Sequence, residues 1–131
     1  MLASRMASSD QRNLLGQALE TCSAEPRTGF FRTGCCETDA HDHGRHVVCA
    51  EMTAEFLAFQ KSRGNDLTAS GPGFPGLRPG DRWCVCAARW KEALDAGVAP
   101  PVHLAATHEA AGETIDREDL LRHAADSQSL N

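Results

Sequence analysis

The cysteines and histidines of this chain are the residues best suited to chemistry, because thiolates and imidazoles are the ligands that zinc prefers. The sequence holds six of each. Cys84 and Cys86 stand one residue apart in the segment GDRWCVCAARW, and side chains with this spacing leave the same face of an extended strand. Both sulfurs can then turn toward one ion. The sequence therefore predicts a metal site, with zinc as the expected cofactor and ligands drawn from Cys35, Cys36, His46, Cys49, Cys84 and Cys86.

Disulfide bonds between neighbouring cysteines are disfavoured by the same geometry. In a strand, the Cβ atoms of Cys84 and Cys86 lie about 6.6 Å apart, whereas a disulfide needs about 3.8 Å. The adjacent pair Cys35 and Cys36 closes only a strained ring. The segment MLASRMASSD at the start of the sequence lacks the apolar run of a secretory signal. We therefore expect reduced thiols in a cytoplasmic protein.

The cysteines are also compatible with two roles that need no metal. Free cysteine is among the most buried residue types and packs as a small hydrophobe, which fits a structural or interaction protein with core cysteines only. The second role is that of a nucleophile in a thiol-dependent enzyme. Cys86 lies just before a predicted helix, with Arg82 and Arg89 near it in sequence, and cations and helix N-termini stabilise a thiolate. His46 or His108 would then serve as its base.

A glycine- and proline-rich segment predicts a site for a small-molecule ligand. Residues 70–80, SGPGFPGLRPG, hold too many of both residue types for a helix or a sheet ladder. Long loops of unusual composition often carry function, and Phe74 supplies an apolar tip that can close a pocket. The candidate polar groups of this pocket are Asn65, Asp66, Asp81, Arg82 and His108.

The composition excludes two classes of partner. The formal net charge is -5 and the 13 basic residues are scattered along the chain, so the basic patch that a nucleic acid requires is missing. No run of about 18 apolar residues is present to span a membrane. A hydrophobic share of 41% and a charged share of 24% are those of a soluble globular domain. The formation of a homo-oligomer is left open.

Hydrophobic periodicity and turn residues predict the elements that position these side chains. We expect strands at 46–52, 82–87 and 100–106, and helices at 54–63, 88–97 and 117–125. Thr53 and Asp116 stand at the N-cap positions of two of these helices.

These elements point to one domain. Their order predicts a small two-layer α+β sandwich, with about three helices on one face of a mixed or antiparallel sheet. The single domain is expected at 13–126, after a disordered leader at 1–12 and before a flexible tail at 127–131.

Five segments of the chain resemble a known bacterial family. They are TGFFRTGCC, HVVCAEMTAEFLAF, GNDL, FPGLRPGDRWCVCAARWKEA and APPVHLAATH, in that order. Together they resemble the family catalogued as domain of unknown function 2237, over roughly residues 13–125. The resemblance implies a small single-domain protein of the two-layer α+β kind, and it brings no established activity. His41 and His43 match no position of the family pattern.

The family pattern falls on many of the candidate residues. Carried over position by position, it matches Cys22, Gly34, Cys35, Cys36, Asp42, Gly44, His46, Cys49, Asn65, Asp66, Asp81, Arg82, Trp83, Cys84, Cys86, Arg89, Trp90 and His108.

Overall fold

The computed structural model describes residues 11–72 and 74–126. Most of the expected leader and the whole of the expected tail lie outside the described residues. Arg12, at the end of that leader, accepts a hydrogen bond at its carbonyl from the Glu109 amide at 2.9 Å. The side chain of Gln11 accepts one from the Thr38 amide at 3.1 Å. Residues 11 and 12 therefore pack against the domain.

In the described part of the chain, regular secondary structure begins at His46. The elements are β1 (His46–Glu51), α2 (Ala54–Ser62), β2 (Arg82–Cys86), α3 (Ala87–Asp95), two short 3-10 helices (Leu104–Ala106 and Glu109–Glu113) and α4 (Arg117–Arg122). The strands predicted at 46–52 and 82–87 and the three predicted helices are present, with bounds that differ by a few residues.

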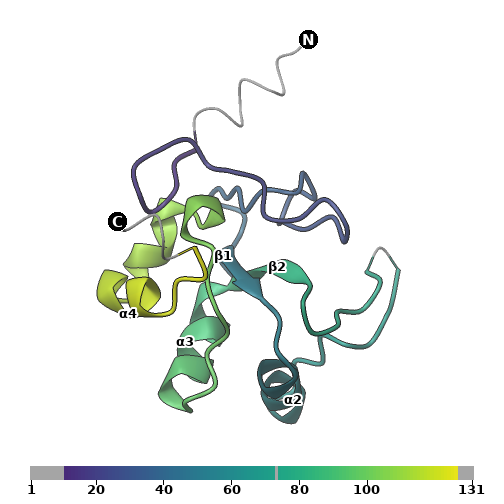
Figure 1. Ribbon diagram of the computed structural model, residues 1–131. Coiled ribbons are helices and arrows are strands. Elements are labelled where there is room, and N and C mark those ends of the chain that lie inside the picture. The colour runs from purple at the N-terminus through teal and green to yellow at the C-terminus, as the bar shows by residue number, and fades with distance from the viewer. Residues whose placement is uncertain (1–10, 73, 127–131) are drawn as a thin grey trace.

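The two strands form an antiparallel pair (Figure 1). In the register of this pair, Cys49 lies directly opposite Cys84, and His46 lies opposite Cys86. The register shifts between His46 and Val48, so the end of β1 that carries His46 departs from regular pairing. The pairing brings four of the candidate residues together on one strand pair.

The ends of α2 and the start of α3 are set by residues next to them in the sequence. The Thr53 hydroxyl accepts a hydrogen bond from the Phe56 amide at 3.0 Å, which confirms Thr53 as the N-cap of α2. Gly64 follows this helix at a φ of 86°, a left-handed conformation that glycine adopts without strain. Helix α3 follows β2 directly, with Cys86 as its N-cap and no side-chain hydrogen bond at that cap.

One expectation about the C-terminal part is wrong, and the expected position of Asp116 is confirmed. Residues 100–106 form no strand; Val102 makes only isolated bridges to Ala50 and Ala124, and the chain then turns into a 3-10 helix. Pro100 and Pro101 have no amide hydrogens for a ladder, which restricts pairing to the one position that follows them. Asp116 occupies the N-cap position of α4, but its side chain makes no capping hydrogen bond.

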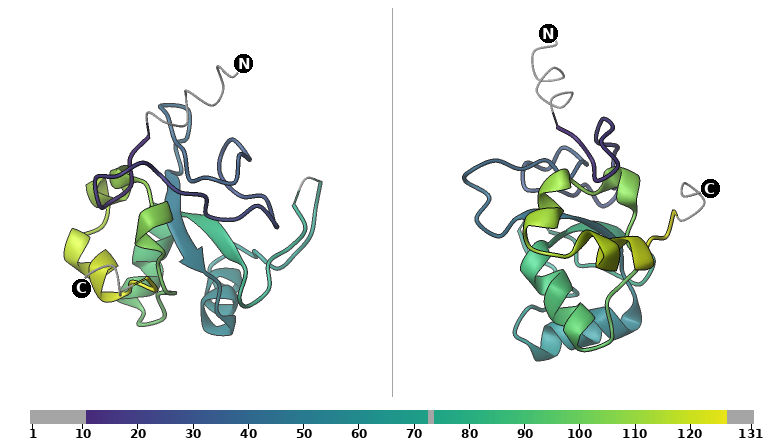
Figure 2. Two further views of the ribbon diagram at one scale, coloured as in Figure 1. Left: turned by 45° about the horizontal axis from the view of Figure 1, so that its top comes forward. Right: turned by 90° about the vertical axis from the view of Figure 1, so that its left-hand side faces the viewer.

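The small α+β fold predicted from the sequence is confirmed. Helices α2 and α3 lie on one side of the strand pair, and the irregular segment before β1 lies on the other (Figures 1 and 2). The described part of the chain has no helix whose length and apolar character would let it cross a membrane.

Two separate cores hold the fold together. The larger one is built from apolar side chains of both strands, the helices and the C-terminal turns, with Trp90 and Phe56 fully buried. The indole Nε1–H of Trp90 donates to the Pro100 carbonyl at 3.1 Å. The smaller core consists of four cysteines and Ala106. Four of the six cysteines therefore pack together, apart from the larger core.

Candidate functional site

Four cysteine sulfurs meet between the strand pair and the N-terminal segment. Cys22 is disulfide-bonded to Cys49, and Cys36 to Cys84, with S–S distances of 2.10 and 2.01 Å. All four residues are at most 3% exposed. We call these four residues the sulfur cluster. One member of each pair comes from the irregular N-terminal segment and the other from a strand, so the two bonds fasten that segment to the sheet.

The expectation that all cysteines are reduced is wrong for these four residues. Local spacing excludes only pairs close along the chain, and Cys84 and Cys86 are indeed not bonded to each other. The bonded pairs are separated by 27 and 48 residues. Such pairs are brought together by the fold, so local spacing carries no information about them.

Two buried threonines fix the backbone behind the sulfur cluster. The amide of Cys84 donates to the Thr28 hydroxyl at 2.8 Å, and the amide of Cys49 donates to the Thr107 hydroxyl at 3.0 Å. The carbonyl of Cys49 accepts from the His103 amide at 2.8 Å. The peptide groups of Cys49 and Cys84 thus point away from each other, which makes this a non-hydrogen-bonded pair, the kind in which facing side chains are closest.

The remaining two cysteines are free thiols, each partly exposed. Cys35 lies in the N-terminal segment, and its sulfur is 3.8 Å from the Thr21 hydroxyl. Cys86 ends β2 and caps the N-terminus of α3. The helix dipole and the amides of the first turn favour an anion at such a position. Of the two thiols, Cys86 therefore has the surroundings that a nucleophile requires.

A buried carboxylate orients the histidine opposite Cys86. The Nδ1 atom of His46 is 2.6 Å from Oδ1 of Asp42, whose side chain is fully buried. The other carboxylate oxygen of Asp42 accepts from the His46 amide at 2.9 Å and from the Thr38 hydroxyl at 3.0 Å. With Nδ1 held as the donor to Asp42, the acceptor of a neutral His46 ring is Nε2. This is the arrangement in which a carboxylate prepares a histidine to take a proton.

Two adjoining hollows lie beside β2 and share His46, Trp83 and Cys84 among their lining residues. The smaller hollow, of about 230 Å³, is also lined by Cys86 and Asn65. His46 and Cys86 therefore face one common space.

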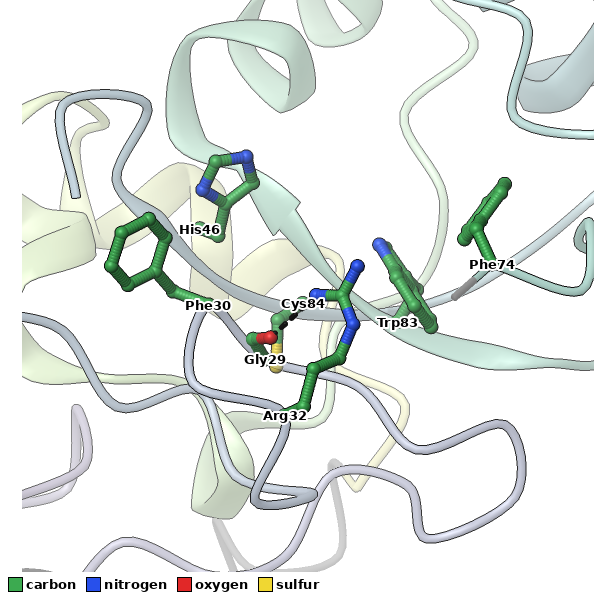
Figure 3. A pocket seen from close by; sticks show the side chains of 7 residues that line it. All are labelled: Gly29, Phe30, Arg32, His46, Phe74, Trp83 and Cys84. Carbon is green, nitrogen blue, oxygen red and sulfur yellow. Dashed lines mark hydrogen bonds between the residues drawn. The ribbon is translucent and has the colours of Figure 1, made fainter. Parts of the chain in front are cut away.

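The larger hollow, of about 400 Å³, lies under aromatic side chains (Figure 3). Phe30 stacks on His46 with ring centroids 6.2 Å apart. Across the hollow, the Arg32 guanidinium lies 5.1 Å from the centre of the Trp83 ring, and Phe74 meets the same ring edge-on. Phe74 thus contacts the pocket wall, and the hollow combines apolar walls with one cationic group.

Of the polar residues proposed for a ligand pocket, Asn65 lines the smaller hollow. Its amide group donates to the side chain of buried Gln60 at 2.8 Å, so Asn65 is held in a fixed orientation. Asp66 instead closes a turn: hydrogen bonds from the hydroxyl and amide of Thr68 hold the pKa of Asp66 below its usual value. Asp66 thereby has a structural partner of its own.

The other three proposed ligand residues lie apart from both hollows within the described part of the chain. Asp81 accepts from the Arg78 amide at 2.9 Å, and Arg82 is exposed at the start of β2. The amide of His108 donates to the Val47 carbonyl at 3.0 Å, on the edge of β1 that faces away from β2. His108 Nδ1 accepts from the Ala110 amide at 2.9 Å, and burial lowers the pKa of His108. His46, and not His108, therefore shares a hollow with Cys86.

The six residues predicted as metal ligands divide between the two regions. Cys36 and Cys49 belong to the sulfur cluster, and His46 and Cys86 line the smaller hollow. Cys84 belongs to the sulfur cluster and also lines this hollow, whereas Cys35 stands apart from both. Cys22 completes the sulfur cluster, although the ligand set predicted from the sequence did not include it. Arg32 was also missed, because nothing in its local sequence connects it with Trp83.

Comparison with known proteins gives a family and no activity. A family model described as "Uncharacterized protein conserved in bacteria (DUF2237)" matches residues 12–124, which is most of the chain. The chain belongs to this family. A search of the curated proteins found no match. The family assignment confirms the resemblance seen in the sequence, and the function has to be inferred from the geometry.

Proposed function

We propose that the protein binds a small acyl compound in the hollows beside β2 and that Cys86 attacks it as a nucleophile. His46 acts as the base for the thiol, and Asp42 orients His46. One observation carries the proposal: Cys86 and His46 lie opposite each other in the register of the strand pair, and both line the smaller hollow. Asp42 holds the far nitrogen of the same ring at 2.6 Å. A nucleophile, a base and an orienting carboxylate in this order are the parts of a thiol-dependent acyl-transfer site.

The reaction we propose is hydrolysis through a thioester. The thiol proton of Cys86 moves to Nε2 of His46, and the sulfur forms a bond to the acyl carbon. The bond from that carbon to the leaving oxygen breaks, and His46 returns the proton to the leaving oxygen. Water then attacks the thioester carbon, His46 takes the water proton, and the carbon–sulfur bond breaks as the sulfur regains its proton. One ester and one water thus give one acid and one alcohol.

Helix α3 supports the developing negative charge in this scheme. Its first-turn amides follow Cys86 directly and donate no hydrogen bond to the N-cap side chain. Such amides are the donors that stabilise an oxyanion or a thiolate. The Ala87 amide already donates to the Arg45 carbonyl at 2.9 Å, which leaves the amides of Ala88 and Arg89 for this task.

The walls of the larger hollow suggest which acyl compounds fit. Trp83 and Phe74 offer apolar faces, and the guanidinium of Arg32 offers donors beyond its bond to the Gly29 carbonyl. An apolar acyl group with an anionic substituent matches this pair of features. We infer a small-molecule substrate and a cytoplasmic location, which keeps the Cys86 thiol reduced and also exposes the two disulfides of the sulfur cluster to cellular reductants.

The test compares the two free thiols. The full chain, with its disulfides intact, is treated with iodoacetamide at neutral pH, and labelling at Cys86 and Cys35 is followed by mass spectrometry of peptides. An ordinary thiol is only a few per cent ionised near neutral pH, so a proton-accepting partner should make Cys86 react roughly tenfold faster than Cys35. His46→Ala should bring the rate at Cys86 down to that of Cys35.

Acyl transfer itself is tested with p-nitrophenyl acetate. We expect a burst of nitrophenolate with about one equivalent per chain and an acetyl group on Cys86. Cys35→Ala is the matched control and should leave the burst unchanged, while Cys86→Ala should abolish it. Equal labelling of both thiols, or acetylation of neither, would contradict the proposal.

A further inference from the structure

The sulfur cluster has no part in the proposed acyl chemistry, and its geometry suits another task. We propose that Cys22, Cys36, Cys49 and Cys84 together bind one zinc-type divalent cation once their two disulfides are reduced. The proposed ligands do not include Cys86 or His46, although Cys84 also lines both hollows. The metal-bound and disulfide forms of the site exclude each other, because both use the same four sulfurs.

The distances between the sulfurs are already close to those of a tetrahedral site. The sulfurs of Cys22, Cys36 and Cys49 all lie within 4.8 Å of one another. Four sulfurs at the usual zinc–sulfur distance of about 2.3 Å stand about 3.8 Å apart. Small side-chain rotations are therefore enough to seat an ion among these three residues.

Cys84 supplies the fourth ligand from the neighbouring strand. It is the register partner of Cys49 in a non-hydrogen-bonded pair, but its sulfur lies outside the group of three sulfurs that are within 4.8 Å of one another. The sulfur of Cys84 is bonded to that of Cys36, a member of the group of three. Once this bond is broken, the Cys84 side chain has to rotate toward the other three sulfurs to complete the site.

The backbone around the sulfur cluster is fixed independently of the disulfides. The Thr28 and Thr107 hydroxyls hold the amides of the two strand cysteines. The amide of Cys22 donates to the Gly34 carbonyl at 2.7 Å, and this bond joins the two N-terminal stretches that carry Cys22 and Cys36. A frame that survives reduction keeps four soft thiolate ligands together, and such a ligand set favours zinc over magnesium or calcium.

The burial of the sulfur cluster decides what kind of metal site it is. The four cysteines are almost completely shielded from solvent. A closed tetrathiolate with no open position is the arrangement of structural zinc, whereas a catalytic zinc keeps one position for water. We therefore assign the ion a structural role. In the reduced protein it holds the N-terminal segment against the sheet, as the two disulfides do in the oxidised protein.

The conversion between the two forms balances with a dithiol as reductant. Each disulfide takes two electrons and two protons from one dithiol, which itself becomes a disulfide. Two dithiols thus convert the sulfur cluster into four thiols. Binding of one divalent cation then releases the four thiol protons and leaves a tetrathiolate complex.

The test uses the untagged full chain in both redox forms. The chain is reduced with dithiothreitol without air, freed of reductant and titrated with cobalt(II), and zinc is then added. We expect about one equivalent of cobalt bound, with a sulfur-to-cobalt charge-transfer band and the visible bands of a tetrahedral ion, all of which zinc removes. The disulfide form should bind none. Cobalt held by exposed histidines such as His41 would lack the charge-transfer band.

Variants separate the sulfur cluster from the free thiols. Cys22→Ser and Cys84→Ser should abolish the tetrathiolate spectrum, whereas Cys35→Ser and Cys86→Ser should leave it unchanged. Because the first two variants can also disturb folding, protection of the unmodified chain gives a second reading. Bound zinc should slow iodoacetamide labelling at the four cluster cysteines and leave Cys35 and Cys86 reactive.

Two results would overturn the proposal. One is binding of less than about 0.2 equivalents of metal by the reduced chain, since structural zinc binds tightly. The other is a zinc-protected set that includes Cys35 or Cys86 in place of a cluster cysteine. Neither result affects the test of Cys86 against Cys35, which is made on the disulfide form.

Discussion

Two pairs of facing residues on β1 and β2, which we call rungs, place similar residues in opposite environments. The buried rung is Cys49 with Cys84, and the open rung is His46 with Cys86. Cys49 and Cys84 face each other under the N-terminal segment and are buried, whereas His46 and Cys86 are partly exposed and line a hollow. The residue types alone do not distinguish the rungs, because each carries a cysteine that can ligate or react. The difference comes from what covers each rung. The N-terminal segment covers Cys49 and Cys84 and forms a disulfide with each of them. His46 and Cys86 instead remain open to a ligand.

The largest effect is expected from removing one cross-link of the buried rung. In the disulfide form, Cys22→Ala with Cys49→Ala should lower the free energy of unfolding by about 3 kcal/mol, because the unfolded chain loses a closed loop. Urea unfolding measures the change, and Cys35→Ala should have an effect within about 0.5 kcal/mol. An equally stable double variant would show that the N-terminal segment is held by its other contacts.

The open rung depends on Asp42, and we expect the second largest effect there. Asp42→Asn replaces a buried acceptor of three hydrogen bonds with an amide that cannot accept them all. The free energy of unfolding should fall by about 2 kcal/mol, and iodoacetamide labelling of Cys86 should slow at the same time. If the labelling rate of Cys86 is unchanged while stability falls, Asp42 has only a structural role. The open rung then has no reactivity that depends on Asp42.

The two threonines behind the buried rung allow a matched comparison. Thr28→Val leaves the Cys84 amide buried without its partner, and Thr107→Val does the same for Cys49. Each change should lower the free energy of unfolding by about 1–2 kcal/mol. Thr114→Val is the control, because Thr114 is exposed and its hydroxyl makes no hydrogen bond within the described residues. A neutral effect of Thr28→Val would mean that the Cys84 amide does not depend on this hydroxyl.

The smallest effect concerns His108, on the edge of β1 away from the hollows. Burial lowers the pKa of His108 from its ordinary value of 6.5, against the opposing charge of Glu109. The unfolded chain then binds a proton more readily than the folded one, so stability is complete above about pH 6.5 and falls as the pH drops toward the lower folded pKa. His108→Asn keeps an acceptor for the Ala110 amide and should flatten this decline in unfolding curves taken between about pH 7 and 5.

The elements near both rungs were readable from sequence because their signals are local. Thr53 and Gly64 bound a helix through a cap and a left-handed turn that depend on a few neighbouring residues. The prediction of a strand at 100–106 was wrong because it depended on contacts with distant residues. Val102 alternates correctly with its neighbours, but whether it pairs over one position or several depends on the distant partners Ala50 and Ala124.

The candidate site was predicted in its residue types and not in its grouping. The position of Cys86 just before a helix was predicted from sequence, as was the failure of Cys84 and Cys86 to bond each other. Asp42 gave no signal of its own, since a carboxylate in a histidine-rich turn resembles a solvated one. Only its burial against His46 and Thr38 separates the two cases.

The sequence by itself determined a small α+β domain of a recognisable family, with its reactive residue types concentrated on β1, β2 and the segment before them. Only the tertiary structure decided that Cys22 and Cys36 meet the strand cysteines while Cys86 stays free. The physical reason is the range of each interaction. Caps, turns and alternation act over a few residues, whereas sulfur pairing and burial depend on segments 27 and 48 residues apart that only packing brings together.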